Sequence, residues 1–371
     1  YHGPGDERLI MEEVSAPTLL SPTDAIVRMT MVAICSADLA AVRGDLSVVP
    51  GTVLGHEAVG IVEEVGPAVR RVQPGQRVVV SAVSACGQCE PCRREMYGQC
   101  RGGGGRLLGR VIDGVHAEFA RIPFADMGLH PLPDHVDDVD AVFLSEVLPT
   151  AYECALARGR LQPGDDVLIV ERGPAGRSPG TFPGPVGLAT LLLARLQGAH
   201  RVIVVDVDDA RLNLALHLGA DHVLNPRRQD IGRAAAGVTG DGVDLAVEAV
   251  GSVEAFELGV GLVRPGGRVA AIGSYSRAVR LGLERLWRRD VTIVTHTMDG
   301  YSMPQLLRLI ETRRLRPRPL ASHIVDFPQL AEAYRLAADA RSSGVCKALA
   351  RSISCYCLGP DPWPPVPWWG G

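Results

Sequence analysis

The 371-residue sequence has no apolar run long enough to cross a membrane. A transmembrane helix needs about 18 consecutive apolar residues, whereas the longest run here, from Val186 to Leu196, is interrupted by Arg195. The first residues, Tyr1-His2-Gly3-Pro4-Gly5, lack the basic and then apolar pattern of a secretory signal. We therefore expect a soluble, cytoplasmic protein with no membrane partner.

A strong charge of one sign is also missing, and lysine is nearly absent. Lys and Arg together number 38 against 42 Asp and Glu, which gives a formal net charge of -4. This mild acidity disfavours general nucleic-acid binding, and a hydrophobic content of 46% excludes a disordered chain.

Lys347 is the single lysine. A lysine can form a Schiff base, but here we expect a structural role.

Cysteine is too sparse, at nine residues, for a disulfide-rich scaffold of this length. Four cysteines nevertheless cluster in CGQCEPCRREMYGQC with the spacing C-x2-C-x2-C-x7-C, namely Cys86, Cys89, Cys92 and Cys100. Four thiolates complete the tetrahedral shell of one zinc ion and leave no position for a substrate. The spacing therefore predicts a structural zinc site. An iron–sulfur cluster is the less favoured alternative, because the spacing differs from that of ferredoxins.

The pattern of secondary structure changes near residue 150. Before it, short β-branched runs separated by Gly and Pro predict an antiparallel, β-rich domain. After it, strands alternate with helices, which predicts a doubly wound parallel sheet. The predicted strands of this second part are 167–170, 201–206, 243–247 and 268–272, with helices at 187–196 and 211–218.

A second set of possible metal ligands lies near the N-terminus. Cys35 precedes the pair His56-Glu57 by about twenty turn-rich residues. A thiolate, an imidazole and a carboxylate form an incomplete set of zinc ligands, which can keep one position open for water or substrate. Taken alone, this pattern has a simpler alternative, since a lone histidine is more often a hydrogen-bonded structural residue.

These residues occur together with the segments PGTVLGHEAVGIVEEVG, GVDLAVEAVG and RPGGRVAAIG. With them, residues 1–350 resemble the zinc-dependent medium-chain dehydrogenase/reductase family, which includes alcohol, sorbitol and formaldehyde dehydrogenases. The resemblance implies an α/β protein with a β-rich GroES-like catalytic domain at 1–149 that carries the zinc lobe 86–100, a Rossmann cofactor domain at 150–296, and a return to the catalytic domain at 297–350. Residues 351–371, rich in Pro and Trp, are expected to form an irregular extension.

The resemblance also implies a function and an assembly. It implies an oxidoreductase that transfers a hydride between NAD(H) and a small alcohol or carbonyl compound polarised by a catalytic zinc. Family members are commonly homodimers or homotetramers that pair through the last strands of the cofactor sheet, here near Arg268 to Ile272.

The implied catalytic metal site is built first from Cys35 and His56. Glu57 would lie behind or on the metal, and Asp38 would orient His56. In the family a third ligand opens a helix four residues before a threonine that contacts the nicotinamide. The segment LSEVLPT offers Glu146 and Thr150 at these positions.

Two features of the site leave alternatives open. Glu146 could instead be a helix N-terminal acid that complements the helix dipole. The residue that begins the proton relay in most alcohol dehydrogenases of the family, a Ser or Thr two positions after the cysteine ligand, is here Ala37. Loss of a positioned proton donor can cost ~10²–10⁴ in rate. The missing hydroxyl at Ala37 leaves open a reductase of C=N or conjugated C=C bonds, or a non-oxidative family member. The altered glycine loop of the cofactor half, described next, leaves open a zinc-stabilised binding protein without turnover.

The glycine loop of the cofactor half also departs from the family. A dinucleotide-binding fold needs glycines between its first strand and first helix. The pattern occurs twice, at 171–176 and 182–187, and each copy lacks the first glycine, so about eleven residues look inserted. The second copy runs directly into the helix. The implied cofactor-binding residues are Gly184, Pro185, Val186, Gly187, Asp206, Arg211 and Val250.

Asp206 bears on the choice of cofactor. It follows Gly187 by nineteen residues, at the end of the second predicted strand. An acidic residue there accepts hydrogen bonds from the adenosine ribose and repels a 2′-phosphate. NAD(H) is therefore expected, and NADP is less favoured.

Overall fold

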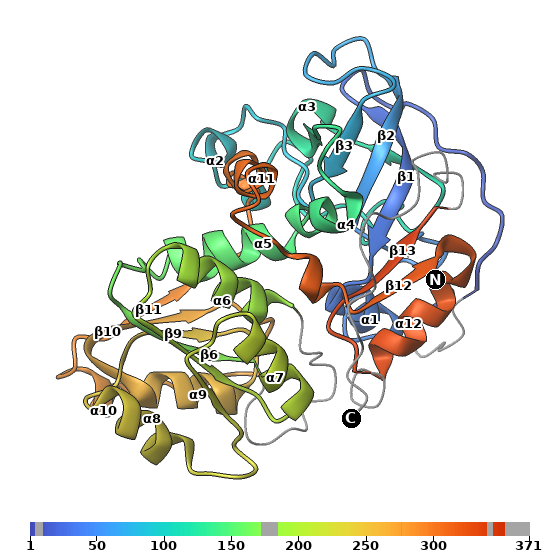
Figure 1. Ribbon diagram of the computed structural model, residues 1–371. Coiled ribbons are helices and arrows are strands. Elements are labelled where there is room, and N and C mark those ends of the chain that lie inside the picture. The colour runs from blue at the N-terminus through green and yellow to red at the C-terminus, as the bar shows by residue number, and fades with distance from the viewer. Residues whose placement is uncertain (4–9, 172–184, 276, 340–343, 353–371) are drawn as a thin grey trace.

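The computed structural model describes residues 1–3, 10–171, 185–275, 277–339 and 344–352. Within them, Figure 1 shows two sheets joined by a run of helical segments. The seven-stranded sheet has the order β12-β13-β1-β2-β3-β5, with β4 paired to β1. Its strands are β1 (Ala25–Ala33), β2 (Glu57–Val65), β3 (Arg77–Val80), β4 (Phe119–Ile122), β5 (Leu129–Pro131), β12 (His323–Asp326) and β13 (Ala348–Arg351). Its pairs are antiparallel, as predicted, except that β12 and β13 run parallel.

The six-stranded sheet is parallel throughout and has the order β11-β10-β9-β6-β7-β8. Its strands are β6 (Asp166–Val170), β7 (Arg201–Val205), β8 (His222–Leu224), β9 (Val243–Glu248), β10 (Val263–Ala271) and β11 (Thr292–Thr295). This is the predicted doubly wound sheet, and with the β-rich sheet it confirms the α/β class.

Alternation along β6 explains how helices cover both faces of the parallel sheet. Val167 and Ile169 belong to the core cluster that contains α6, whereas Leu168 and Val170 belong to the cluster that contains α8 and α9. Successive side chains of a strand point to opposite faces, and a strand buried on both faces is apolar throughout. The uninterrupted run Val167–Val170 therefore belongs at the centre of the sheet.

Short polar side chains begin several of the helices. Asp208, Asp230 and Ser252 each accept a hydrogen bond from a backbone amide in the first turn of the helix that follows, as expected of N-cap residues. The longer helices are α1 (Ser36–Arg43), α6 (Val186–Leu196), α7 (Asp209–His217), α8 (Ile231–Thr239), α9 (Val253–Leu262), α11 (Met303–Glu311) and α12 (Leu330–Ala338), with a π-helix at Thr150–Ala157. The short ones are α2 (Glu90–Arg93), α3 (Ala125–Gly128), α4 (Asp138–Ala141), α5 (Val147–Pro149) and α10 (Leu283–Leu286).

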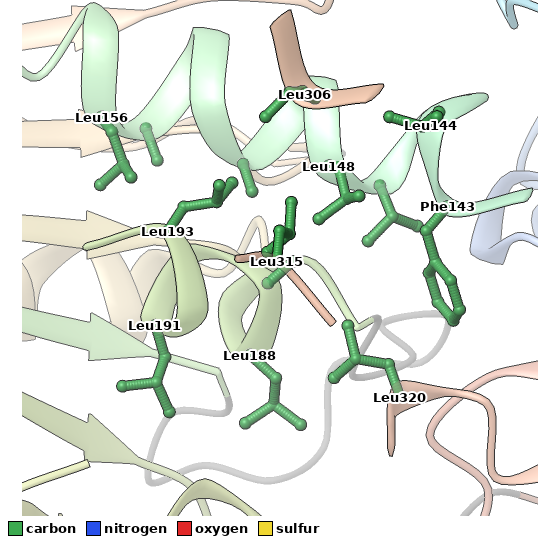
Figure 2. Packing of buried hydrophobic residues seen from close by; sticks show 14 of the residues in the cluster. Phe143, Leu144, Leu148, Leu156, Leu188, Leu191, Leu193, Leu306, Leu315 and Leu320 are labelled. Carbon is green, nitrogen blue, oxygen red and sulfur yellow. The ribbon is translucent and has the colours of Figure 1, made fainter. Parts of the chain in front are cut away.

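One apolar cluster joins the two sheets. Figure 2 shows part of this cluster, in which Phe143, Leu144 and Leu148 from the segment around α5 are joined by Leu188 of α6 and Leu306 of α11. Each fully buried side chain of this size contributes about 1.5–3 kcal/mol relative to its exposed state. The packing fixes the segment around α5 between the sheets, and so fixes the backbone of Glu146 at its start.

The edge of the parallel sheet differs from the prediction. We expected pairing of subunits near Arg268 to Ile272, but β10 lies one strand inside the edge because β11 adds to it in parallel. The outer strand is thus Thr292–Thr295, which the sequence pattern did not reveal. In the part of the chain that the structure describes, each helix is too short or too polar to span a bilayer.

Candidate active site

Three distant segments bring together the ligands predicted for the catalytic metal. Cys35 directly precedes α1, His56 and Glu57 lie at the start of β2, and Glu146 directly precedes α5. One ligand atom from each of the four lies within 4.8 Å of the others. Glu146 Oε2 is 3.2 Å from Cys35 Sγ and 3.1 Å from His56 Nε2. A thiolate, an imidazole and two carboxylates are a donor set that zinc accepts.

Asp38 ties the cysteine and histidine segments together. Its carboxylate accepts hydrogen bonds from the backbone amides of Cys35 at 2.8 Å and Gly55 at 3.2 Å, and it lies 3.4 Å from His56 Nδ1. Burial alone would lower the pKa of His56, but the Asp38 and Glu146 carboxylates raise it well above its ordinary value. Asp38 thus lies where it would orient the ring and leave Nε2 facing the other ligands.

Burial affects the protonation of Cys35, one of the predicted metal ligands. Burial and the Glu146 carboxylate raise the pKa of the Cys35 thiol to about 11. A thiol with such a pKa stays protonated at neutral pH, while a bound metal ion holds the thiolate form. The donor set therefore fits a zinc ion, which would take the place of the protons on Cys35 and His56.

Glu57 and the single lysine form a fully buried ion pair behind the ligands. Lys347 Nζ donates to Glu57 Oε1, and the two side chains are 3% and 0% exposed. Glu57 Oε2 is buried and has no hydrogen-bond partner among the described residues. One oxygen of Glu57 is thus neutralised by Lys347 and the other is left for a cation. The structural role expected for Lys347 corresponds to this ion pair.

Arg106 is a site residue that the sequence reasoning missed. Its guanidinium donates to Glu146 Oε1 at 2.7 Å and to Thr297 Oγ1 at 2.8 Å. Burial would raise the pKa of Glu146, but His56 and Arg106 hold it well below its ordinary range. The carboxylate is therefore ionised, with Oε1 on Arg106 and Oε2 on the metal side. No local pattern marks Arg106, since it follows a glycine run and meets Glu146 only through the fold.

Thr150 lies one helical turn beyond Glu146. Its backbone amide donates to the Glu146 carbonyl at 2.9 Å, and its buried hydroxyl has no partner among the described residues. A buried hydroxyl without a partner costs free energy unless something bonds to it. The hydroxyl is thus available to a ligand, one helical turn beyond Glu146.

The four cysteines of the predicted zinc lobe also come together. Their sulfur atoms lie within 4.8 Å of one another, with Cys89 and Cys92 3.4 Å apart. Backbone amides point at these sulfurs, and the amide of Arg101 lowers the pKa of Cys89 to about 6. A Cβ on Gly102 would lie 2.5 Å from Cys86 Sγ, so only glycine allows this approach. The lobe fits a zinc ion with four thiolate ligands.

The cofactor residues predicted in the parallel sheet lie at its carboxyl edge. Asp206 follows β7, Val250 follows β9, and Pro185, Val186 and Gly187 begin α6. Ligands of doubly wound sheets bind at this edge. Gly184 lies outside the described residues.

Glu171 and Arg211 occupy this edge in a way the sequence did not reveal. Arg211 donates to Glu171 Oε2 at 2.9 Å and to Asp206 Oδ2 at 3.0 Å, and all three side chains are buried. A Cβ on Gly187 would lie 2.0 Å from Glu171 Oε1. The residues that follow β7 and β9 lie at the edge of the sheet where a dinucleotide would bind, while a carboxylate of the chain itself lies against the start of α6.

A β-rich sheet with a four-cysteine lobe, a parallel doubly wound sheet, and the cluster of Cys35, His56, Glu57 and Glu146 form the arrangement expected of a metal-dependent dehydrogenase. Two family models match the chain, the "Alcohol dehydrogenase GroES-like domain" at residues 21–134 and "Zinc-binding dehydrogenase" at 185–312. An alcohol dehydrogenase of Cupriavidus necator is 32% identical over 348 residues, covering 88% of this chain and 92% of the relative.

Solved structures agree with these matches. An alcohol dehydrogenase from Thermus sp. ATN1 superposes with a TM-score of 0.85 at 34% identity, covering 94% of this chain and 98% of that one. A dehydrogenase of Escherichia coli CFT073 in complex with NADH gives 0.82 at 26% identity, with 94% and 97% covered. The chain therefore belongs to the zinc-dependent medium-chain dehydrogenase/reductase family, and it is an alcohol dehydrogenase-like oxidoreductase that uses zinc and NAD(H). The reductase and binding-protein alternatives raised by Ala37 and the glycine loop are not favoured.

Proposed function

We propose that this chain oxidises an alcohol or reduces the matching carbonyl compound at a zinc ion held by Cys35, His56 and Glu146, with Glu57 behind or on the metal. The observation that supports this most is the convergence of these four side chains, from three separate segments, within 4.8 Å. A zinc ion bound there would polarise the substrate oxygen, and NAD(H) would exchange the hydride.

The surrounding residues divide the remaining tasks. Asp38 orients His56, Lys347 neutralises one oxygen of Glu57, and Arg106 keeps Glu146 ionised. The free hydroxyl of Thr150 would contact the nicotinamide end of the cofactor. We further propose that Cys86, Cys89, Cys92 and Cys100 hold a second, structural zinc ion.

We propose NAD(H) rather than NADP as the cofactor. Asp206 follows β7 at the carboxyl edge of the sheet, where an acid binds ribose hydroxyls and repels a 2′-phosphate. Its carboxylate already accepts hydrogen bonds from Arg211 and from the amide of Asp208. It is therefore held in place before any cofactor arrives.

Metal analysis tests the proposed sites. The purified chain should contain about two zinc ions, and a Cys35→Ala variant should contain one. Retention of two zinc ions by Cys35→Ala would place the second metal elsewhere.

Cofactor choice and substrate are tested together. Fluorescence titration should give a lower dissociation constant for NADH than for NADPH. Asp206→Ala should reduce the ratio of these two constants by roughly tenfold. A panel of alcohols and aldehydes then identifies the substrate. A protein that binds zinc but neither nucleotide would refute the proposed function.

We also propose that the protein forms a homodimer or homotetramer through the edge of the cofactor sheet. The half-exposed strand β11 (Thr292–Thr295) offers that edge, because an open strand edge can pair with another chain. Analytical ultracentrifugation of the wild type and of a Thr292→Pro variant tests this: the proline should raise the monomer fraction.

A further inference from the structure

Glu171 occupies the first-glycine position of the copy of the glycine pattern at 171–176, the copy that directly follows β6. It directly follows β6, and its backbone amide extends the pairing with β7 by donating to the Val205 carbonyl at 2.9 Å. That hydrogen bond fixes the backbone of Glu171 beside β7. The side chain, 2% exposed, turns toward the start of α6.

The carboxylate of Glu171 lies against the first turn of that helix. Its Oε1 is 2.0 Å from the position that a Cβ on Gly187 would take, and it has no hydrogen-bond partner among the described residues. The start of an α-helix carries free amides and a partial positive charge, so it attracts anions, and in dinucleotide folds the anion is the cofactor's diphosphate. Glu171 thus places an internal anion at this position.

Arg211 holds that anion in place. It pairs with Glu171 Oε2 at 2.9 Å and with Asp206 Oδ2 at 3.0 Å, and it is buried against both. The same guanidinium therefore links the start of α6 to the acid expected to bind the adenosine ribose. Any molecule that takes the place of Glu171 meets Arg211 as its counter-ion.

We propose that Glu171 is an intramolecular competitor of the cofactor's diphosphate: NAD(H) binds when this carboxylate leaves the start of α6, and Arg211 then pairs with the cofactor in its place. The inference rests on the proposed function, because it concerns how this chain binds NAD(H). Burial raises the pKa of Glu171 to about 7 despite Arg211. The ionised carboxylate is therefore held against a desolvation penalty, which its transfer to water relieves.

Binding titrations of the purified full-length chain test the competitor. NADH is titrated by fluorescence, and ADP-ribose, which carries the diphosphate without nicotinamide, is titrated by calorimetry. We expect Glu171→Gly to lower both dissociation constants by roughly tenfold or more. Glu171→Gln keeps the shape without the charge and should give a smaller gain.

Asp165→Asn is the matched control. Asp165 is also buried and paired with an arginine, Arg268 at 2.8 Å, but it precedes β6 at the opposite edge of the same sheet. This variant should leave both affinities within about twofold of wild type. Circular dichroism and thermal unfolding show which variants are folded, and Glu171→Gln preserves the packing should Glu171→Gly unfold.

The outcomes separate the inference from the proposed function. If folded Glu171 variants bind NADH and ADP-ribose more tightly than wild type, the inference and the proposed function are both supported. The same holds if the variants bind and wild type binds too weakly to measure. Binding by wild type that is unchanged in both Glu171 variants overturns the inference alone. Absence of binding by wild type and by every folded variant overturns both.

Discussion

The two cysteine-containing clusters of this molecule are built in opposite ways. The lobe takes four thiolates from fifteen consecutive residues, and backbone amides of the same segment point at its sulfurs. The active-site cluster takes one cysteine sulfur, one imidazole and two carboxylates from three segments up to 111 residues apart. Three of the lobe cysteines are partly exposed, whereas His56 and both glutamates of the active site are buried.

The difference shows how a metal site is prepared for chemistry. The lobe draws its four candidate ligands from one loop, and four thiolates would close the shell of a bound zinc ion. In the active site three of the four candidate ligands have a charged neighbour, namely Asp38 for His56, Lys347 for Glu57 and Arg106 for Glu146. Such neighbours orient the ligands and adjust their charge, so the second cluster depends on the whole fold.

The largest expected effect separates the two clusters by activity. Cys35→Ala should lower kcat/KM by about a thousandfold or more, because polarisation of the substrate at the metal is lost. Thermal unfolding should change little. Steady-state kinetics and metal analysis on the same preparation measure both quantities.

Cys92→Ala is the counterpart in the lobe. It should also remove one zinc ion, but its main effect should be a lower unfolding temperature, because a structural zinc site contributes directly to folding. If folded Cys92→Ala lost as much activity as Cys35→Ala, the division into a structural and a catalytic cluster would be wrong.

The second effect concerns stability at the buried pair behind the active site. Lys347→Met leaves the Glu57 carboxylate buried without its counter-ion and should lower the free energy of unfolding by about 3–5 kcal/mol. Urea unfolding of the metal-free protein measures it. Adding Glu57→Gln to the same chain should recover part of the loss, because no unpaired charge then remains.

Arg264→Met provides the comparison for a pair in contact with water. Arg264 and Asp244 form an ion pair at 2.7 Å, but the arginine side chain is 43% exposed. Its loss should cost about 1 kcal/mol or less. If Lys347→Met and Arg264→Met lowered the free energy of unfolding equally, the buried ion pair would contribute no more to stability than the exposed one.

The same contrast explains what the sequence could predict. The lobe follows from spacing alone, and the alternation of strands and helices predicts the doubly wound sheet. The active-site cluster needed a family resemblance, because Cys35, His56 and Glu146 share no local pattern. The partners Lys347 and Arg106 lie far from their glutamates in sequence, at separations of 290 and 40 residues, so that only the fold reveals them.

The cofactor loop shows a different limit. The sequence marked Glu171 as a departure from the glycine pattern, but it could not show where the side chain would go. Its position depends on Arg211, forty residues away, and on the open space beside Gly187. A missing glycine is visible in one sequence, whereas the group that fills its place is a property of packing.

The smallest expected effect tests whether the charged neighbours matter once zinc is bound. Arg106→Met frees Glu146 Oε1 and removes the link to Thr297, so Glu146 should lose its fixed orientation. We expect kcat/KM of the zinc-saturated enzyme to fall by about 10–100-fold. Arg106→Lys should retain part of the activity, because an ammonium group keeps the charge but not the paired hydrogen bonds to Glu146 and Thr297.

The control is Arg101→Met, which changes only an exposed side chain of the lobe and should leave kcat/KM unchanged. If Arg106→Met matched Arg101→Met, the active-site ligands would be as self-sufficient as those of the lobe, and the contrast between the clusters would rest on their donor atoms alone.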